Sequence, residues 1–273
     1  MTTGATAHLF ELSWRGGATE ARLHRRRPGA DAMPWGTLDL ATIAPEIAAE
    51  ARQVWTNGVF TEYASAAAFT SLTTALLECG APVDLVAMSA DIVVDELFHV
   101  ELSARLTTEL GGAVPLAFDL GQVSPLTTPG VRPLMRAAEI AITTSCVSEA
   151  LSVPAMARSR ALATAPLVRA VLDRLLADEG PHGRLGFWFL EWASESLTHA
   201  ERADLARLAL TTIEVYAPLW QEDECASCAP PIGLGGHDAI GRRALRDAVI
   251  KKIARPLAKH GIVLDPVRLA ALA

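Results

Sequence analysis

Apolar residues recur every three or four positions along most of the chain after Leu38, which is the pattern of amphipathic helices. Gly80 is the expected end of the first helix, and Pro82 suits the first turn of the second. A bend is expected near Asn57-Gly58, because this dipeptide is typical of turns. The segments predicted to be helical are 43–79, 82–110, 133–163, 166–197, 199–221 and 238–261.

The links between these segments predict how the helices are arranged. The first two helices are joined tightly, as are the next two, but residues 111–132 contain three Pro and four Gly. Two helical hairpins with a long connection form a four-helix bundle with one crossover. We therefore expect an all-α fold. Its expected parts are an irregular segment 1–37, in which 7–14 and 18–24 could pair as a hairpin, a metal-binding bundle 38–222, and a loop and C-terminal helix 223–273 packed on the bundle.

Composition narrows the choice of partners. The net charge is -7, and no basic stripe is interleaved with aromatic residues, so nucleic acid is not an expected partner. The basic cluster 23–29 is interpreted as a solvated loop. No uninterrupted apolar run reaches the length of a membrane span, and the N-terminus lacks the features of a secretory signal, so a cytoplasmic location without a membrane partner is expected. Cys225 and Cys228 form a single C-x-x-C, which with His237 leaves a structural zinc site as an alternative.

A short motif, Asp-Glu-x-x-His, occurs twice within the predicted bundle, and each copy follows a glutamate on the preceding helix. Residues three apart share a face of a helix, so the Glu and His of one motif can contact the same ion. The intervals between each upstream glutamate and its motif allow one helical hairpin to return to the same height. The two sets are Glu62, Asp95, Glu96 and His99, and Glu149, Asp178, Glu179 and His182.

Excluding the two Asp residues, these sets place four carboxylates and two imidazoles at one level of the predicted core. Burying four carboxylates without cations would be prohibitive, and two divalent ions would balance their charge. Carboxylate and imidazole together suit iron or manganese. A single Glu-x-x-His is often an ordinary surface pair, but two copies with matching upstream glutamates favour a shared site.

This arrangement resembles the ferritin-like di-iron carboxylate superfamily over roughly residues 50–197. The resemblance implies two iron ions, with manganese open at one or both positions. Glu62, Glu96 and His99 would hold mainly one ion and Glu149, Glu179 and His182 the other, with Glu96 and Glu179 bridging. It also implies that Asp95 supports His182 and that Asp178 supports His99; the alternative is that both Asp residues are solvated.

The same resemblance implies oxygen or peroxide activation. The doubled motif is similar to di-iron oxygenases of the p-aminobenzoate N-oxygenase type, but their extra His is absent, because Leu175 and Leu176 occupy that turn. We expect an oxygenase or oxidase that uses O2, a small organic substrate and an external electron donor; a homodimer is left open. The alternatives are a ferritin-like protein that handles iron or peroxide without an organic substrate, and a metal-stabilised structural bundle.

Three further features carry predictions. Glu101 lies two residues past His99 and should point away from the ions. Gly180-Pro181 inside the second motif predicts a distorted helix between about 177 and 183, and the alternative is a helix break that removes His182 from the site. Four aromatic residues either enclose a substrate or are plain core: Phe98, Phe187, Trp188 and Trp192.

Overall fold

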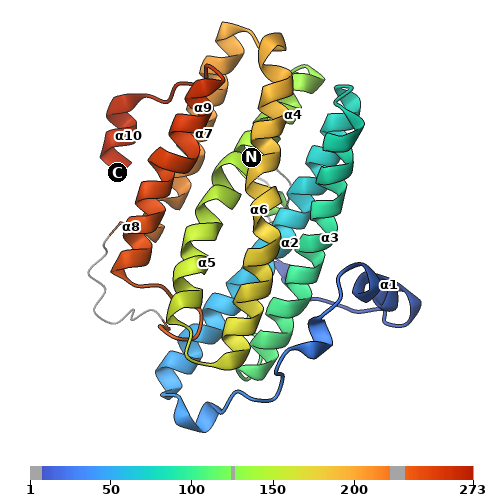
Figure 1. Ribbon diagram of the computed structural model, residues 1–273, viewed down its shortest axis with the longest axis vertical. Helices are drawn as coiled ribbons and strands as arrows, with labels where there is room; N and C mark the ends of the chain where they lie inside the picture. The colour runs from blue at the N-terminus through green and yellow to red at the C-terminus, as the bar shows by residue number, and fades with distance from the viewer. Residues whose placement is uncertain (1–7, 124–126, 222–230, 273) are drawn as a thin grey trace, which may run out of the picture.

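The computed structural model describes residues 8–123, 127–221 and 231–272, and its centre is a bundle of long helices running along the longest axis of the molecule (Figure 1). The third bundle helix is continuous but changes its winding in the middle, where η4 is π-helical. The bundle consists of α2 (Pro45–Glu78), α3 (Val83–Glu109), the run α4 (Pro133–Ala141), η4 (Ile142–Glu149) and α5 (Ala150–Leu162), and α6 (Pro166–Ala193).

Further helices lie at the edges of the bundle. Figure 1 shows α1 set beside α3, whereas the C-terminal helices stand on the side of α5. These elements are α1 (Ala18–Arg26), α7 (His199–Tyr216), α8 (Ala239–Ala248), the π-helical η7 (Val249–Ala254), α9 (Arg255–Lys259) and α10 (Pro266–Leu272). Short strands β1 (His8–Leu9) and β2 (Ala117–Phe118) pair antiparallel, and 3-10 turns cover Ala30–Ala32, Leu40–Thr42, Leu120–Gln122, Ser194–Ser196 and Ala217–Leu219.

The predicted fold class is confirmed: the protein is an all-α four-helix bundle with one long crossover and additional C-terminal helices. Two local predictions are wrong, and one short helix was missed. The N-terminal hairpin does not form, because 18–26 is helical and β1 pairs with β2 in the crossover instead. The helix over Asn57-Gly58 is continuous, since buried Trp55 and Val59 anchor both sides of the glycine. The short α10 was not predicted.

Apolar side chains form two separate clusters along the bundle. On α2, Trp55 belongs to one cluster and Phe69 to the other, and on α6 the same division falls between Leu175 and Leu185. The interval on α2 holds Glu62, and the interval on α6 holds the second Asp-Glu-x-x-His motif. A polar layer is therefore enclosed between two apolar layers, which restricts the access of water to it.

The approach of α6 to the π-helical segment depends on a missing side chain. A Cβ atom on Gly186 would lie 2.5 Å from Sγ of Cys146 and 2.8 Å from the carbonyl oxygen of Ala141. Ser145 bridges the two helices at this point: its hydroxyl accepts a hydrogen bond from the backbone N–H of Gly186 at 2.8 Å and donates one to the carbonyl of His182. Close backbone packing thus fixes η4 against α6.

Replacing Gly186 by Ala should lower the free energy of unfolding by about 1–3 kcal/mol, because the new methyl group collides with backbone and a buried sulfur. Gly58 is the matched control: a Cβ there meets no atom within 4 Å, and the position lies inside a helix. Gly58→Ala should therefore raise stability by roughly 0.5–1 kcal/mol. Urea denaturation of both variants checks the pair, and a stable Gly186→Ala protein would contradict the close approach.

The predicted distortion at Pro181 is wrong. Residues 177–183 lie inside the continuous α-helix α6, and the irregular winding is found in the facing segment η4. One feature makes the proline tolerable. Ala177, whose carbonyl loses its N–H partner, is exposed, so water can reach it. The alternative of a broken helix is likewise wrong.

By length and composition, the helix Pro133–Leu162 could cross a membrane, with a mean hydropathy of 1.3 over its most apolar window, although polar residues interrupt its apolar positions. In the structure 56% of that window is buried inside the protein. Its apolar character is accounted for by its central place in the bundle, as in the core helix of a soluble protein.

Candidate metal centre

The structure brings all six predicted ligands together in the polar layer. Each bundle helix contributes from its middle: Glu62 from α2, the first motif from α3, Glu149 from the end of η4, and the second motif from α6. Side-chain exposure is 17% for Glu62 and at most 2% for Glu96, Glu179 and both histidines. The layer is therefore buried, with Glu62 nearest to solvent.

The two imidazoles turn the same ring atom toward the carboxylates. Nδ1 of His99 lies 3.5 Å from Oε2 of Glu62 and 3.6 Å from Oε1 of Glu179. Nδ1 of His182 lies 3.0 Å from Oε1 of Glu96 and 3.4 Å from Oε2 of Glu179. Glu96 and Glu179 thus contact both halves of the cluster.

The residues present fit two metal ions. Within the described residues, two groups of four have ligand atoms that all lie within 4.8 Å of one another, and both groups contain Glu96 and Glu179. Nδ1 of each histidine, both oxygens of Glu96 and Oε2 of Glu179 are buried without a hydrogen-bond partner. Buried polar atoms are rarely left unpaired, and these converge on the space between the four helices. The groups are Glu62, Glu96, His99 and Glu179, and Glu96, Glu149, Glu179 and His182.

The two Asp residues sit behind the imidazoles in the crossed arrangement that the resemblance implies. Oδ2 of Asp178 lies 3.3 Å from Nε2 of His99, and Oδ2 of Asp95 lies 3.5 Å from Nε2 of His182. A carboxylate at Nε2 orients the ring and leaves Nδ1 free to bind a metal. The metal-binding role of the six candidate ligands and the supporting role of the two Asp residues stay predictions, whereas the grouping of these side chains is a fact of the structure.

Each Asp is itself held by an arginine that the motif did not reveal. Nε of Arg174 donates to Oδ2 of Asp178 at 2.8 Å, and the Arg174 guanidinium lies 5.0 Å from the ring centroid of Phe98. Arg27 donates to Oδ1 of Asp95. The i, i+4 spacing of Arg174 and Asp178 on one helix could have identified the first pair. Nothing in the sequence places Arg27 there, because it lies 68 positions from Asp95.

The sequence analysis also did not identify two serine hydroxyls that contact Glu149. Ser65 of α2 donates to Oε1 of Glu149 at 2.8 Å, and the hydroxyl of Ser152 lies 3.5 Å from Oε2 of the same carboxylate. Both serines occur among small residues of helices, where they resemble ordinary packing positions. They restrict the orientation of Glu149.

Glu101 lies away from the cluster, as expected, but it is buried, with 5% of its surface exposed. Both its oxygens lie 2.9 Å from Nε2 of His24. The basic cluster 23–29 is therefore not a solvated loop. Its first residues form the C-terminal end of α1, and His24 and Arg27 bind acidic residues of α3. The sequence interpretation failed because the acidic partners are distant in the chain.

Electrostatics in the metal-free cluster follow from burial and crowding. Burial raises the pKa of Glu62 to about 7, and burial together with Glu179 raises the pKa of Glu149 well above its usual value. Burial also raises the pKa of Glu179. For Glu96, contacts with His182 and His99 outweigh burial and repulsion by Glu149, and its pKa is lowered.

The imidazoles respond in the opposite sense to burial. Burial alone would lower their pKa values, but the surrounding carboxylates dominate and raise the pKa of His182 to about 12. Contacts with Asp178, Glu62 and Glu96 likewise raise the pKa of His99 well above its usual value. The raised pKa values favour the positively charged form of both rings in the metal-free chain, and this charge offsets that of the carboxylates.

Metal loading should therefore release about two protons or more per chain, because each imidazole must lose its Nδ1 proton to bind an ion. Protons compete with metal below the raised histidine pKa values, so metal affinity should increase steadily from pH 6 to pH 9. Calorimetric titration with Mn²⁺ in buffers of different ionisation enthalpy measures the released protons. Affinity that does not change with pH would contradict protonated imidazoles in the metal-free chain.

The four aromatic residues do not surround the cluster. Phe98 is fully buried in one apolar layer, whereas Trp188 and Trp192 are 37% and 38% exposed on the outside of α6. Phe187 packs, half-buried, against the other apolar layer. Of the two alternatives, plain core fits Phe98 and Phe187, whereas Trp188 and Trp192 are too exposed to be core.

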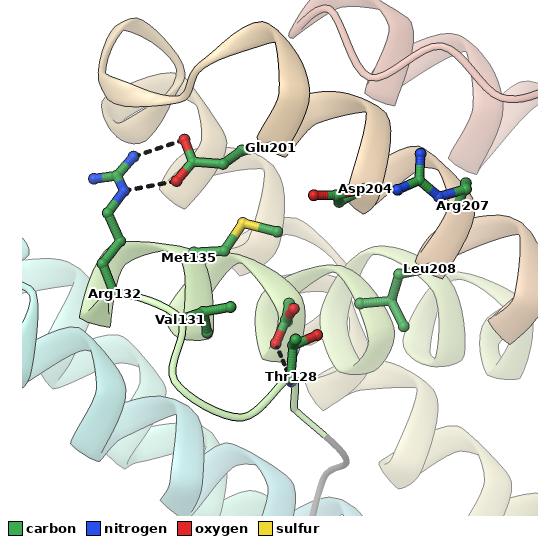
Figure 2. A pocket seen from close by; sticks show the side chains of 9 residues that line it. Thr128, Val131, Arg132, Met135, Glu201, Asp204, Arg207 and Leu208 are labelled. Atoms are coloured by element: carbon green, nitrogen blue, oxygen red, sulfur yellow. Dashed lines mark hydrogen bonds and ion pairs between the residues drawn. The ribbon is translucent and has the colours of Figure 1, made fainter.

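The pocket in Figure 2 is also separate from the cluster. It measures about 580 Å3 and lies between α4 and α7. Its cations are already paired, Arg132 with Glu201 and Arg207 with Asp204. A second, open groove of about 850 Å3 lies between α1 and α3. Neither is lined by any of the six candidate ligands.

Comparison with known proteins gives a likeness of fold. No protein-family model matches the chain, and no curated protein matches it in sequence. Among solved structures, it is similar to a protein from Synechococcus described as having aldehyde deformylating oxidase activity, with a TM-score of 0.55 and 15% identity. The match covers 86% of this chain and 98% of the other. At this identity the likeness shows the fold, which is ferritin-like.

Proposed function

We propose that the protein is a di-iron oxidoreductase that uses O2 to oxidise a small organic substrate. The observation that carries the proposal is the pair of overlapping four-residue groups that share Glu96 and Glu179. Such sharing suits two adjacent ions bridged by carboxylates. The ferritin-like fold and the oxidase activity of the structural neighbour support the choice of an oxidoreductase.

The carboxylates and the imidazoles would have different roles in holding such a centre. The four Glu side chains balance the charge of two divalent ions, and each His offers Nδ1 while its Nε2 faces an Asp. When bound, two reduced iron ions would supply electrons for the reduction of O2. The apolar layers on either side would limit the access of water. Glu62, at 17% side-chain exposure, lies nearest to solvent, and small molecules would enter from its side.

The substrate class is open to direct assay. Aldehydes are the first compounds to test, because the structural neighbour is described as acting on an aldehyde. The chain's own residues give no basis for N-oxygenation, since Leu175 is buried core in the turn where the related arylamine oxygenases carry an extra His. An external electron donor would be needed to return the iron to its reduced state between turnovers.

The test is anaerobic loading with two equivalents of Fe²⁺, followed by O2 and then by substrate. The proposal predicts an optical change on adding O2 and O2 consumption that rises when an organic substrate and a reductant are both present. O2 uptake that depends on iron alone, with accumulation of ferric iron, would instead favour an iron-handling protein. Metal binding that stabilises the chain without any O2 response would favour a structural role.

A further inference from the structure

An N-terminal arm, residues 18–27, docks on α3 from outside the bundle. Figure 1 shows α1, which forms most of this arm, standing beside α3 rather than within the bundle. His24 binds both oxygens of Glu101, and Arg26 lies 3.3 Å from Oδ1 of Asp91. Arg27 binds Asp95 and also reaches the carbonyl of Asp91 at 3.0 Å.

The contact between Arg27 and Asp95 differs from the others in burial and in what lies behind it. The side chains of Arg27 and Asp95 are 13% and 14% exposed, whereas those of Arg26 and Asp91 are about half exposed. The second carboxylate oxygen of Asp95 faces Nε2 of His182 at 3.5 Å. The chain of contacts thus runs from the arm, through Asp95, to an imidazole of the cluster.

On the His99 side of the candidate centre, an arginine and an Asp make the corresponding contacts, but this arginine belongs to the bundle. Arg174 binds Asp178, whose carboxylate faces Nε2 of His99. That arginine belongs to the bundle and lies four residues before its Asp on α6. The His182 half therefore depends on a residue from outside the bundle, and the His99 half does not.

We infer that Arg27 is a positioning residue for the metal centre, through which the docked N-terminal arm orients Asp95 and the His182 imidazole. This inference rests on the proposed dinuclear site. Without Arg27, the Asp95 carboxylate is free to turn toward solvent, and His182 loses the partner that fixes its ring. Residues that orient a metal-binding histidine typically change metal affinity 10–100-fold.

The experiment titrates the full-length chain with Co²⁺, whose visible spectrum reports the ligands of each ion. Arg27→Ala should weaken one of the two equivalents by about 10–100-fold and alter the same bands that are lost in His182→Ala. Arg174→Ala should alter the bands that are lost in His99→Ala. Arg27→Lys should restore part of the affinity, because lysine keeps the charge but cannot hold Asp95 and the Asp91 carbonyl together.

Arg26→Ala is the matched control, because it removes an arm cation that binds Asp91 and leaves Asp95 paired. Its Co²⁺ titration should match that of the parent. The inference is overturned if Arg27→Ala keeps the parent affinity and spectrum, or if Arg26→Ala weakens binding equally, since that would indicate general docking of the arm. If the parent chain binds no Co²⁺ at all, the proposed dinuclear site fails together with the inference.

Discussion

Replacing Glu179 by Gln should abolish tight binding of both ions and at the same time make the metal-free protein more stable. Glu179 belongs to both groups of candidate ligands, so its loss removes a ligand from each. Its pKa is raised by burial, which means that the folded chain holds its charge at a cost. The amide has nearly the same shape without that charge, and a gain of about 0.5–2 kcal/mol is expected near neutral pH.

The direction of the stability change follows from the sign of the shift. A carboxyl group whose pKa is raised on folding destabilises the folded state once the pH exceeds its ordinary value, and the cost grows until the pH passes the raised value. The advantage of Glu179→Gln should therefore be present at pH 7 and vanish near pH 4, where the unfolded carboxyl group is also protonated.

The measurements are metal content by mass spectrometry after loading with Fe²⁺, and thermal unfolding of the metal-free protein at both pH values. Glu191→Gln serves as the control, because this exposed carboxylate lies on the same helix but outside the cluster. It should leave metal content unchanged. Glu179→Gln protein that still carries two ions would contradict the bridging role.

The cluster was predictable because its determinants are local. The i, i+3 spacing within each motif and the length of each helical hairpin place Glu62, Glu96 and His99 at one level without any knowledge of packing. Helix ends were predictable for the same reason: Gly80 takes a positive φ of 69° at the end of α2, a conformation that glycine adopts without strain.

Features that depend on distant contacts were not predictable. Arg27 and Asp95 are brought together only when the arm docks, and neither residue has a pattern that names its partner. The π-helical segment that ends at Glu149 packs closely against Gly186, which lies on another helix. The sequence suggested an irregularity at Pro181 because the effect of proline on a helix is a local rule. The irregular winding is instead found in η4, on the facing helix.

Metal loading should raise the melting temperature on the order of 10 °C, the largest stability change expected for this chain. A ligand that binds only the folded state stabilises it by RT ln(1 + [L]/Kd), about 2.7 kcal/mol per site at 100 Kd. About 2–4 °C accompanies each kcal/mol in proteins of roughly this size. Two ions would also neutralise the carboxylates that burial leaves crowded around Glu96 and Glu179.

Scanning calorimetry of metal-free protein and of protein loaded with Mn²⁺, at pH 7 and with free metal held constant, measures this shift. The Glu179→Gln variant separates site binding from loose binding at surface carboxylates, since it keeps the surface and lacks one carboxylate that belongs to both groups of candidate ligands. Its melting temperature should respond little to metal. Equal shifts in parent and variant would mean that the stabilising ions bind elsewhere, and no shift in either would remove the buried dinuclear site altogether, because four converging carboxylates cannot bind two ions in the folded chain without stabilising it.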